Sequence, residues 1–133
     1  SCVALAPDPA SEEDGYLFAL EVLTQPLDVD LVVLSACETG RGRLERGEGV
    51  VGLTRAFLGG GARGGVASLW PVSDASTARL MEAFYRGLFE DRLSTAESLR
   101  RARGALIDDE RTAHPWYWAA FVQVGPDRAL RLQ

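Results

Sequence analysis

Residues 31–37 read Leu-Val-Val-Leu-Ser-Ala-Cys, and the class of the fold is predicted from them first. Its four consecutive large apolar residues predict a strand buried on both faces, which is typical of a central strand in a parallel sheet. The strand ends on two small residues, then Cys37 follows, and residues 38–49 are rich in glycine and charged side chains. Open α/β sheets bind and transform their ligands at the carboxyl ends of such strands. Cys37 is therefore the first candidate for a chemical role.

The next two segments predict a parallel partner for this strand. Residues 49–58 place apolar side chains at helical spacing, and the three glycines at 59–61 end the helix. Residues 65–70 read as a second buried strand, which Pro71 stops. A strand, a helix and a strand in this order form a right-handed crossover between parallel strands, so the sequence predicts an α/β fold.

Short elements are expected at both ends of the chain. Residues 3–6 and 119–124 are predicted to be strands, and residues 15–22 a short apolar helix. The chain has 133 residues and contains no internal repeat and no low-complexity linker. Residues 1–133 are therefore expected to belong to a single domain.

Two helices are predicted between the second strand and the last one. The first is expected over about 74–90, with Ser73 or Asp74 as its N-cap. Ser94 and Glu97 have the spacing of a capping box at the start of the second. The residues predicted to face the core are Thr77, Met81, Phe84 and Leu88 in the first helix and Leu99, Ala102 and Leu106 in the second.

Composition excludes several classes of function. Hydrophobic residues make up 47% of the chain, so it is globular, and a net charge of -5 argues against nucleic acid as a partner. No apolar run is long enough to span a membrane, and no membrane partner is expected. All 14 basic residues are arginine, which indicates a G+C-rich genome, and a bacterial source is expected.

The cysteine and histidine content excludes a metal site and a disulfide scaffold. Cys2 and Cys37 are the two cysteines, and His114 is the single histidine. Two distant cysteines and one histidine do not have the spacing of metal ligands. An apolar-rich chain of this length is not held together by disulfides, so reduced thiols and a cytoplasmic location are expected.

Two roles are open to Cys37 on position alone. As a nucleophile it must be a thiolate, but a free thiol has a pKa of about 8.5 and needs a neighbouring imidazole or a helix N-terminus. The other role is that of a small buried residue at the end of a strand, which is common for free cysteine. Its neighbours do not decide between these roles.

A family resemblance favours the nucleophile. The sequence resembles CHAT domains, caspase-like cysteine peptidases often attached to tetratricopeptide repeats, and residues 31–40 resemble their nucleophile motif. The resemblance covers nearly the whole chain and is carried further by residues 15–17, 21–22, 47–53, 55–58, 61–63, 66–70, 74, 77, 80–81, 84–85 and 114–121.

This resemblance implies a fold, an activity and partners. The implied fold is a caspase-like three-layer αβα sandwich with a mainly parallel central sheet. The implied activity is hydrolysis of peptide bonds in protein substrates, with Cys37 as the nucleophile and its backbone amide in the oxyanion hole. No cofactor is implied, and the parent chain is expected to carry tetratricopeptide repeats.

One departure from the family pattern limits this expectation. The general base of the family is a histidine followed by glycine, some tens of residues before the cysteine, and residues 1–36 contain no histidine. The start of the chain looks like the stretch just after that pair. We therefore expect the base in an N-terminal portion of the same domain and little activity from residues 1–133 alone. A strand edge left without that portion would recruit another chain, for example in a dimer.

Other residues near the carboxyl ends of the strands have competing interpretations. Glu38 and Asp74 could bind a basic substrate side chain, although Asp74 also suits a helix N-cap. His114 precedes a proline far along the chain and is expected to pack or to form hydrogen bonds. The aromatic residues Trp116 to Trp118 are expected to pack, with a partner surface as the alternative.

Two further function classes remain as alternatives. The run Gly59-Gly60-Gly61-Ala62-Arg63-Gly64 fits G-x-G-x-x-G, but it follows a helix and precedes a strand, the wrong order for binding phosphate. A nucleotide-binding domain is thereby disfavoured. A non-catalytic caspase-like scaffold in signalling assemblies is the main alternative to the peptidase.

Overall fold

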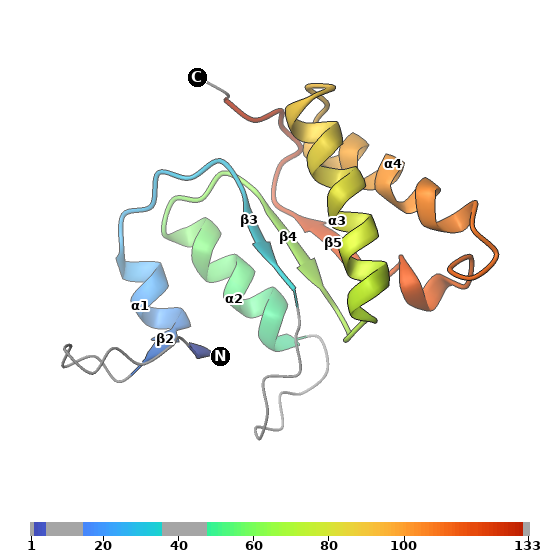
Figure 1. The fold of residues 1–133 in the computed structure, drawn as a ribbon. Coiled ribbons are helices and arrows are strands. Elements are labelled where there is room, and N and C mark those ends of the chain that lie inside the picture. Colours follow the sequence, from blue (N-terminus) through green and yellow to red (C-terminus); the bar gives the residue numbers. More distant parts are fainter. Residues whose placement is uncertain (1, 5–14, 36–47, 132–133) are drawn as a thin grey trace.

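A computed structural model describes residues 2–4, 15–35 and 48–131 (Figure 1). Helices and strands alternate along much of this part of the chain, which confirms the α/β class. In chain order the elements are β1 (Cys2–Ala4), β2 (Tyr16–Phe18), α1 (Ala19–Thr24), β3 (Val32–Leu34), α2 (Glu48–Gly59), β4 (Gly65–Ser68), α3 (Asp74–Phe89), α4 (Thr95–Ile107), the 3-10 helix η1 (Pro115–Tyr117) and β5 (Phe121–Val124).

The main sheet has three strands in the order β3-β4-β5. β3 and β4 are parallel, with Val33 opposite Val66, as the strand-helix-strand pattern predicted. β5 is antiparallel to β4, with Val122 opposite Ala67. The described sheet is therefore mixed rather than mainly parallel, because the chain enters β5 from the same end of the sheet at which β4 stops.

β3 lies at the edge of this sheet, not at its centre. Its three residues are half-buried, whereas all four residues of β4 are buried. The prediction of a central strand buried on both faces therefore fits β4 and is wrong for β3 within the described residues. A run of apolar residues indicates that both faces of a strand are covered. It does not indicate how many strands pair with that strand, because pairing uses backbone hydrogen bonds and not side chains.

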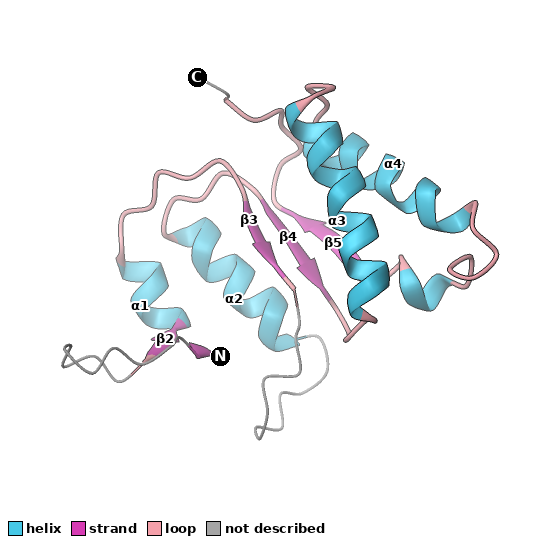
Figure 2. Ribbon diagram, viewed as in Figure 1, coloured by secondary structure: helices cyan, strands magenta, loops and turns pink. Residues whose placement is uncertain are grey.

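Helices cover both faces of the sheet (Figure 2). Val33 packs against the cluster that contains buried residues of α3 and α4, and Leu34 packs against the cluster formed by α1 and α2. Successive side chains of a strand point to opposite faces, so the two clusters lie on opposite sides of β3. The sheet is thus the middle one of three layers.

The N-terminal prediction of a helix over 15–22 is partly wrong. Tyr16–Phe18 is a strand that pairs with β1 in a separate antiparallel sheet, and the helix α1 begins only at Ala19. Gly15 has a φ of 78°, which turns the chain into β2. Tyrosine and phenylalanine favour strands, and pairing with a distant segment decided between the two conformations.

The capping predictions for α3 and α4 are largely confirmed. The Ser73 hydroxyl accepts a hydrogen bond from the Ser76 amide, and the Ser94 hydroxyl accepts one from the Glu97 amide. The Glu97 carboxylate bonds to Arg100, so only the serine half of the predicted capping box is seen.

The core stripe was predicted correctly for α4 and only in part for α3. Leu99, Ala102 and Leu106 are buried in α4, as expected. Phe84 and Leu88 are buried in α3, but Thr77 and Met81 are half-buried and the positions just before them take their place. The buried residues of α3 are Ser76, Leu80, Phe84, Gly87 and Leu88.

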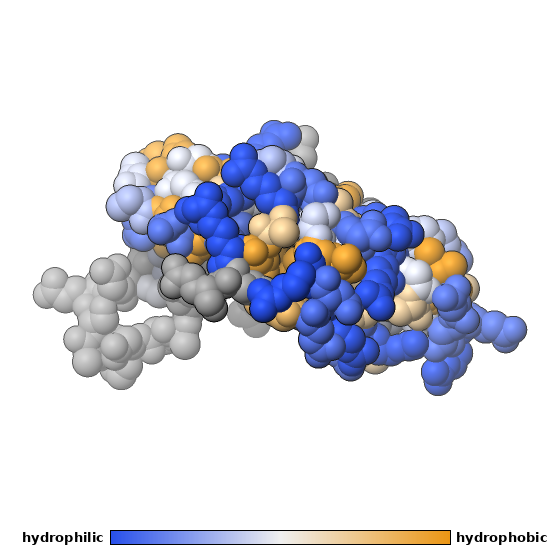
Figure 3. All heavy atoms as spheres, turned by 90° about the horizontal axis from the view of Figure 1, so that it is seen from above, coloured by the Kyte–Doolittle hydropathy of each residue, from blue (hydrophilic) through white to orange (hydrophobic). Residues whose placement is uncertain are grey.

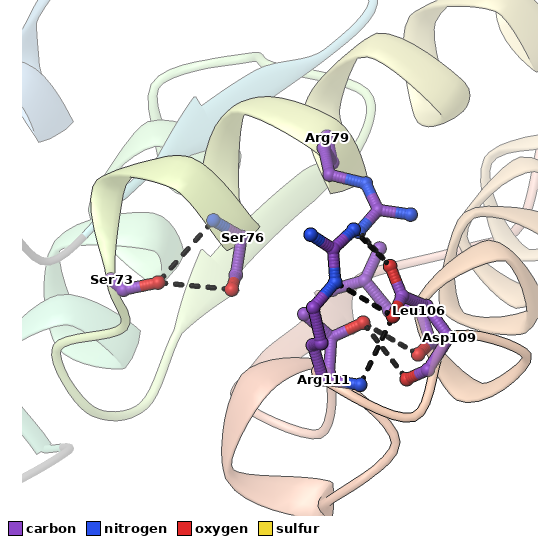
Figure 4. A network of polar contacts seen from close by, with 7 residues as sticks. Ser73, Ser76, Arg79, Leu106, Asp109 and Arg111 are labelled. Carbon is purple, nitrogen blue, oxygen red and sulfur yellow. Dashed lines mark hydrogen bonds and ion pairs between the residues drawn. The ribbon is translucent and has the colours of Figure 1, made fainter.

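A polar network fastens the turn after α4 to α3 (Figure 4). The Asp109 carboxylate accepts hydrogen bonds from Arg111 and from Arg79 of α3, at 2.7 Å for the latter. These arginines hold the pKa of Asp109 well below its usual range, with Arg111 the larger cause. The Thr112 hydroxyl donates to the Leu106 carbonyl at 2.7 Å. The loop that leads from α4 to η1 is thereby fixed in place.

Candidate functional site

The carboxyl ends of β3 and β4 and the start of β5 meet at one edge of the sheet. Leu34 lies opposite Ala67, and Ser68 lies opposite Phe121. The chain after β3, the chain after β4 and the segment before β5 therefore share this edge, which we call the carboxyl edge. It is where an open α/β sheet places a ligand site.

The proposed nucleophile follows β3 in the sequence. Cys37 comes three residues after Leu34, the last residue of β3. Cys37 and Glu38 both lie outside the described residues, so their predicted roles stay predictions.

Asp74 lies at the carboxyl edge with its side chain exposed. It is the first residue of α3, and the Ser73 hydroxyl caps the helix instead of the Asp74 carboxylate. The capping role that competed with substrate binding therefore belongs to Ser73. A carboxylate in the first turn is stabilised by the helix dipole and can still face a ligand.

His114 has a structural position rather than a catalytic one. Its Nδ1 accepts a hydrogen bond from the Trp116 amide at 3.2 Å, and it is the N-cap of η1. An imidazole nitrogen that accepts this bond orients the backbone before β5. This geometry agrees with the expected hydrogen-bonding role.

Two tryptophans form a pair at the carboxyl edge, and this pairing was not predicted from the sequence. The rings of Trp70 and Trp116 stack, with centroids 5.7 Å apart and planes inclined by 29°. The Trp70 indole N–H donates to the Trp116 carbonyl at 3.0 Å. The sequence did contain a sign of this pairing: Trp70 ends a predicted strand, and Trp116 precedes another predicted strand of the same sheet.

The glycine run at the end of α2 serves close packing. A Cβ atom on Gly60 would lie 2.5 Å from the Val22 carbonyl oxygen, and one on Gly61 would lie 2.4 Å from the Leu27 carbonyl oxygen. Gly61 also has a φ of 118°, which side chains disfavour. The glycines therefore allow the end of α2 to pack closely against the backbone that connects α1 to β3. This agrees with their predicted position at the end of a helix.

On its outer edge, β3 has backbone groups that no strand among the described residues pairs with. The Val32 amide donates to the Gly64 carbonyl at 3.0 Å, so Val32 faces β4. Backbone groups alternate along a strand, which turns the N–H and C=O of Val33 away from β4. Within the described residues no strand lies on that side.

A groove runs beside this edge on the α3 side, and its lining is apolar apart from the Asp30 carboxylate and the Tyr85 hydroxyl. The stacked rings of Tyr85 and Phe89, 6.0 Å apart, form one wall, and Leu31 and Val33 form the other. Seen from above, the molecule has a hydrophobic area near its middle that hydrophilic residues border (Figure 3). Tyr85 and Phe89 are 39% and 49% exposed, so apolar surface reaches solvent on the side of β3 where the described residues include no further strand.

The opposite edge of the sheet is protected. The Leu69 amide donates to the Ala120 carbonyl, so Phe121 turns its own carbonyl away from β4. The guanidinium of Arg103, from α4, donates to that carbonyl. A charged side chain on an edge strand blocks pairing with another chain. The two edges of the sheet thus differ, and β3 is the open one.

The family model of the CHAT domain matches residues 1–126. The chain belongs to the CHAT domain family. Membership agrees with the resemblance stated from the motifs around Cys37.

Two relatives of this CHAT domain are tetratricopeptide repeat proteins. It is 38% identical over 114 residues to Tetratricopeptide repeat protein 28 of Mus musculus, an alignment that covers 86% of the chain and 5% of that protein. It is 36% identical over 118 residues to the protein of the same name from Homo sapiens, covering 89% of the chain and 5% of that protein. The chain thus spans a small part of these relatives. Both are mammalian, so they lend no support to the expected bacterial source.

The described part of the CHAT domain contains no helix that could span a membrane. It also contains no group of three or more histidine, cysteine, aspartate or glutamate residues that could hold a metal ion.

Proposed function

We propose that this chain is the cysteine-bearing part of a caspase-like cysteine endopeptidase domain. The observation that carries the proposal is the match to the CHAT family, together with the position of Cys37 just beyond a strand of an α/β sheet. In this view residues 1–133 belong to one domain, and the substrate is a protein.

The proposed reaction is acyl transfer through a thioester. The Cys37 thiolate attacks the carbonyl carbon of the scissile peptide bond, and the Cys37 amide helps to bind the oxyanion. The tetrahedral intermediate collapses, the C–N bond breaks, and a histidine upstream of Ser1 passes the thiol proton to the leaving amine. Water then hydrolyses the thioester and returns the thiol. Residues 1–133 alone lack this base and are expected to be nearly inactive.

The open edge of β3 supports an upstream contribution. A further strand beside β3 would satisfy the outward N–H and C=O of Val33 and cover the groove next to Tyr85 and Phe89. It would extend the described three layers toward the caspase-like sandwich. It would also end at the carboxyl edge if it ran parallel to β3, which is where a base for Cys37 is needed.

Asp74 and Glu38 are proposed to bind a basic side chain of the substrate. Asp74 is exposed at the carboxyl edge and begins α3, so its carboxylate is free of the capping role that Ser73 fills. A carboxylate pair at this edge would favour arginine or lysine before the scissile bond.

The test is labelling and cleavage by the full-length parent protein. We expect a thiol-reactive active-site probe to label the wild type and the Cys2→Ala variant, and Cys37→Ala to lose both labelling and cleavage of a proteome-derived peptide library. The mapped cleavage sites report whether the residue before the cut is basic. Equal cleavage by the wild type and Cys37→Ala would overturn the proposal.

A non-catalytic scaffold is the second candidate. Both reported relatives are named as tetratricopeptide repeat proteins, and such repeats in the parent chain would suit assembly. The candidates differ in what precedes Ser1. A histidine followed by glycine in the upstream sequence favours the peptidase, and its absence favours the scaffold.

A further inference from the structure

We propose that a cavity at the amino ends of β3 and β4 binds an oxyanion, which is a carboxylate or a phosphate group. Arg63, Arg128 and Arg131 line this cavity. It lies at the edge of the sheet opposite the carboxyl edge, because Asp30, which also lines it, precedes β3, and Arg63 precedes β4. The proposal is therefore independent of the peptidase function.

The lining of the cavity carries more positive than negative charge, although the whole chain has a net charge of -5. Three arginines face a single carboxylate, that of Asp30. Both oxygens of Asp30 already accept hydrogen bonds, one from the Arg63 side chain and one from the Arg131 amide. The positive charge of Arg131 also contributes to the low pKa of Asp30, so its guanidinium acts on this cavity.

The guanidinium groups of Arg128 and Arg131 have no carboxylate partner among the described residues. Every ion pair in this part of the chain is made by another arginine. The two other carboxylates nearby are engaged elsewhere: Asp28 pairs with Arg63 from a 90% exposed position, and Asp127 accepts a hydrogen bond from the Ala96 amide. Two cations without a counter-ion at one cavity favour an anion there.

The backbone that carries these two arginines is fixed on both sides of the cavity. The amide and the hydroxyl of Thr95, at the start of α4, both donate to the Arg128 carbonyl at 3.1 Å. The Arg131 amide donates to Asp30 at 3.0 Å. A backbone ordered in advance loses little entropy when a ligand binds. Because the Thr95 amide is already bonded, the anion would be bound by guanidinium groups and not by the end of the helix.

The size of the cavity limits its occupant to a small group. Its volume is about 60 Å³, which equals the liquid volume of about two water molecules. A carboxylate or a phosphate group has this size, whereas a nucleotide base does not fit. Arginine binds both oxyanions through paired N–H donors in one plane. The cavity therefore suits a lone oxyanion or one carried on a side chain.

Thermal unfolding of residues 1–133 in three sodium salts tests the site. Phosphate, acetate and chloride are compared at pH 7 and equal ionic strength. We expect the wild-type midpoint to be about 3 °C higher in phosphate, in acetate or in both than in chloride, because a ligand of the folded chain stabilises it. A rise in phosphate alone identifies a phosphate site, and a rise in acetate identifies a carboxylate site. Arg128→Gln/Arg131→Gln should lose the rise.

A matched control variant separates the cavity from general effects of charge and salt. Arg55 in α2 and Arg92 in the turn after α3 are exposed, form no ion pair with the described residues and do not line the cavity. Arg55→Gln/Arg92→Gln removes the same charge and should keep the rise. Phosphate also stabilises proteins by exclusion from their surface, which affects all variants alike.

A second measurement does not depend on the stability of any variant. During a phosphate titration of wild-type residues 1–133, the amide NMR signals of Arg128 and Arg131 should shift and saturate, while those of Arg55 and Arg92 should not. Equal midpoint rises in the wild type and in Arg128→Gln/Arg131→Gln would overturn the proposal. Equal, unsaturated drifts of all four amide signals in phosphate and in acetate would overturn it as well.

Discussion

Asp30 joins three distant segments through one carboxylate. Its Oδ1 accepts from Arg63 at 2.5 Å, and its Oδ2 accepts from the Arg131 amide at 3.0 Å. Arg63 also contacts Asp28 at 2.8 Å. Asp30 precedes β3, Arg63 precedes β4, and Arg131 lies in the C-terminal segment. This single residue therefore aligns the amino ends of the two parallel strands.

These contacts predict a dependence of stability on pH. The hydrogen bond from Arg63 is the larger cause that lowers the pKa of Asp30 below its ordinary value of 3.8. Because the folded pKa is the lower one, the stabilisation is fully present above pH 3.8 and is lost as the pH falls through the folded value.

Urea unfolding of residues 1–133 between pH 2 and pH 6 measures this effect. We expect the unfolding midpoint of the wild type to fall more steeply below about pH 4 than that of Asp30→Asn. Arg63→Gln should give a similarly shallow curve, because it removes the donor instead of the acceptor. Parallel curves for the wild type and both variants would contradict the role given to Asp30.

Two helices, α3 and α4, approach closely at a glycine. A Cβ atom on Gly87 of α3 would lie 2.9 Å from Oγ and 3.2 Å from Cα of Ser98 in α4, so one helix would have to move. Gly104 of α4 is different, since a Cβ atom there would meet nothing within 4 Å. Glycine is thus required for close packing at position 87 of α3, whereas position 104 of α4 has room for a side chain.

This difference gives a matched pair of substitutions. Gly87→Ala should destabilise the protein by about 1–3 kcal/mol, because forcing an extra carbon into a packed contact costs that much. Gly104→Ala should stabilise it by about 1 kcal/mol, because alanine is the better helix former and fits without a contact. Chemical denaturation of the two variants measures both values. Stabilisation by both substitutions would show that the helices can separate at no cost.

Elements whose signals are local were predicted best from the sequence. The start of α4 follows from a serine cap, and its core stripe follows from the spacing of three apolar residues. The conformation of residues 16–18 could not be predicted in this way, because it depends on pairing with β1. The stacked Trp70 and Trp116 are 46 positions apart in the sequence and meet only because β5 runs back beside β4.

Within the described residues, the sheet has one closed edge and one open edge. Arg103 protects β5, whereas Val33 directs its N–H and C=O outward from β3 next to an apolar groove. The sequence predicted an open edge from the missing upstream histidine but placed the Cys37 strand at the centre of the sheet. The position of a strand in a sheet depends on the partners present, and these are set by chain outside the strand itself.

The open edge predicts that residues 1–133 associate through β3 when nothing else covers it. Val33→Pro tests this, because proline removes an N–H that points away from β4 and its φ suits an edge strand, while its ring keeps an apolar group against the α3–α4 cluster. In sedimentation velocity, the wild type should form a dimer and Val33→Pro should be a monomer. Gln123→Pro is the matched control: it removes an outward N–H on β5, the edge that Arg103 already protects, and it should dimerise like the wild type. A monomeric wild type, or a dimer that survives Val33→Pro, would exclude β3 as the assembly edge and weaken the case for an upstream strand at the same place.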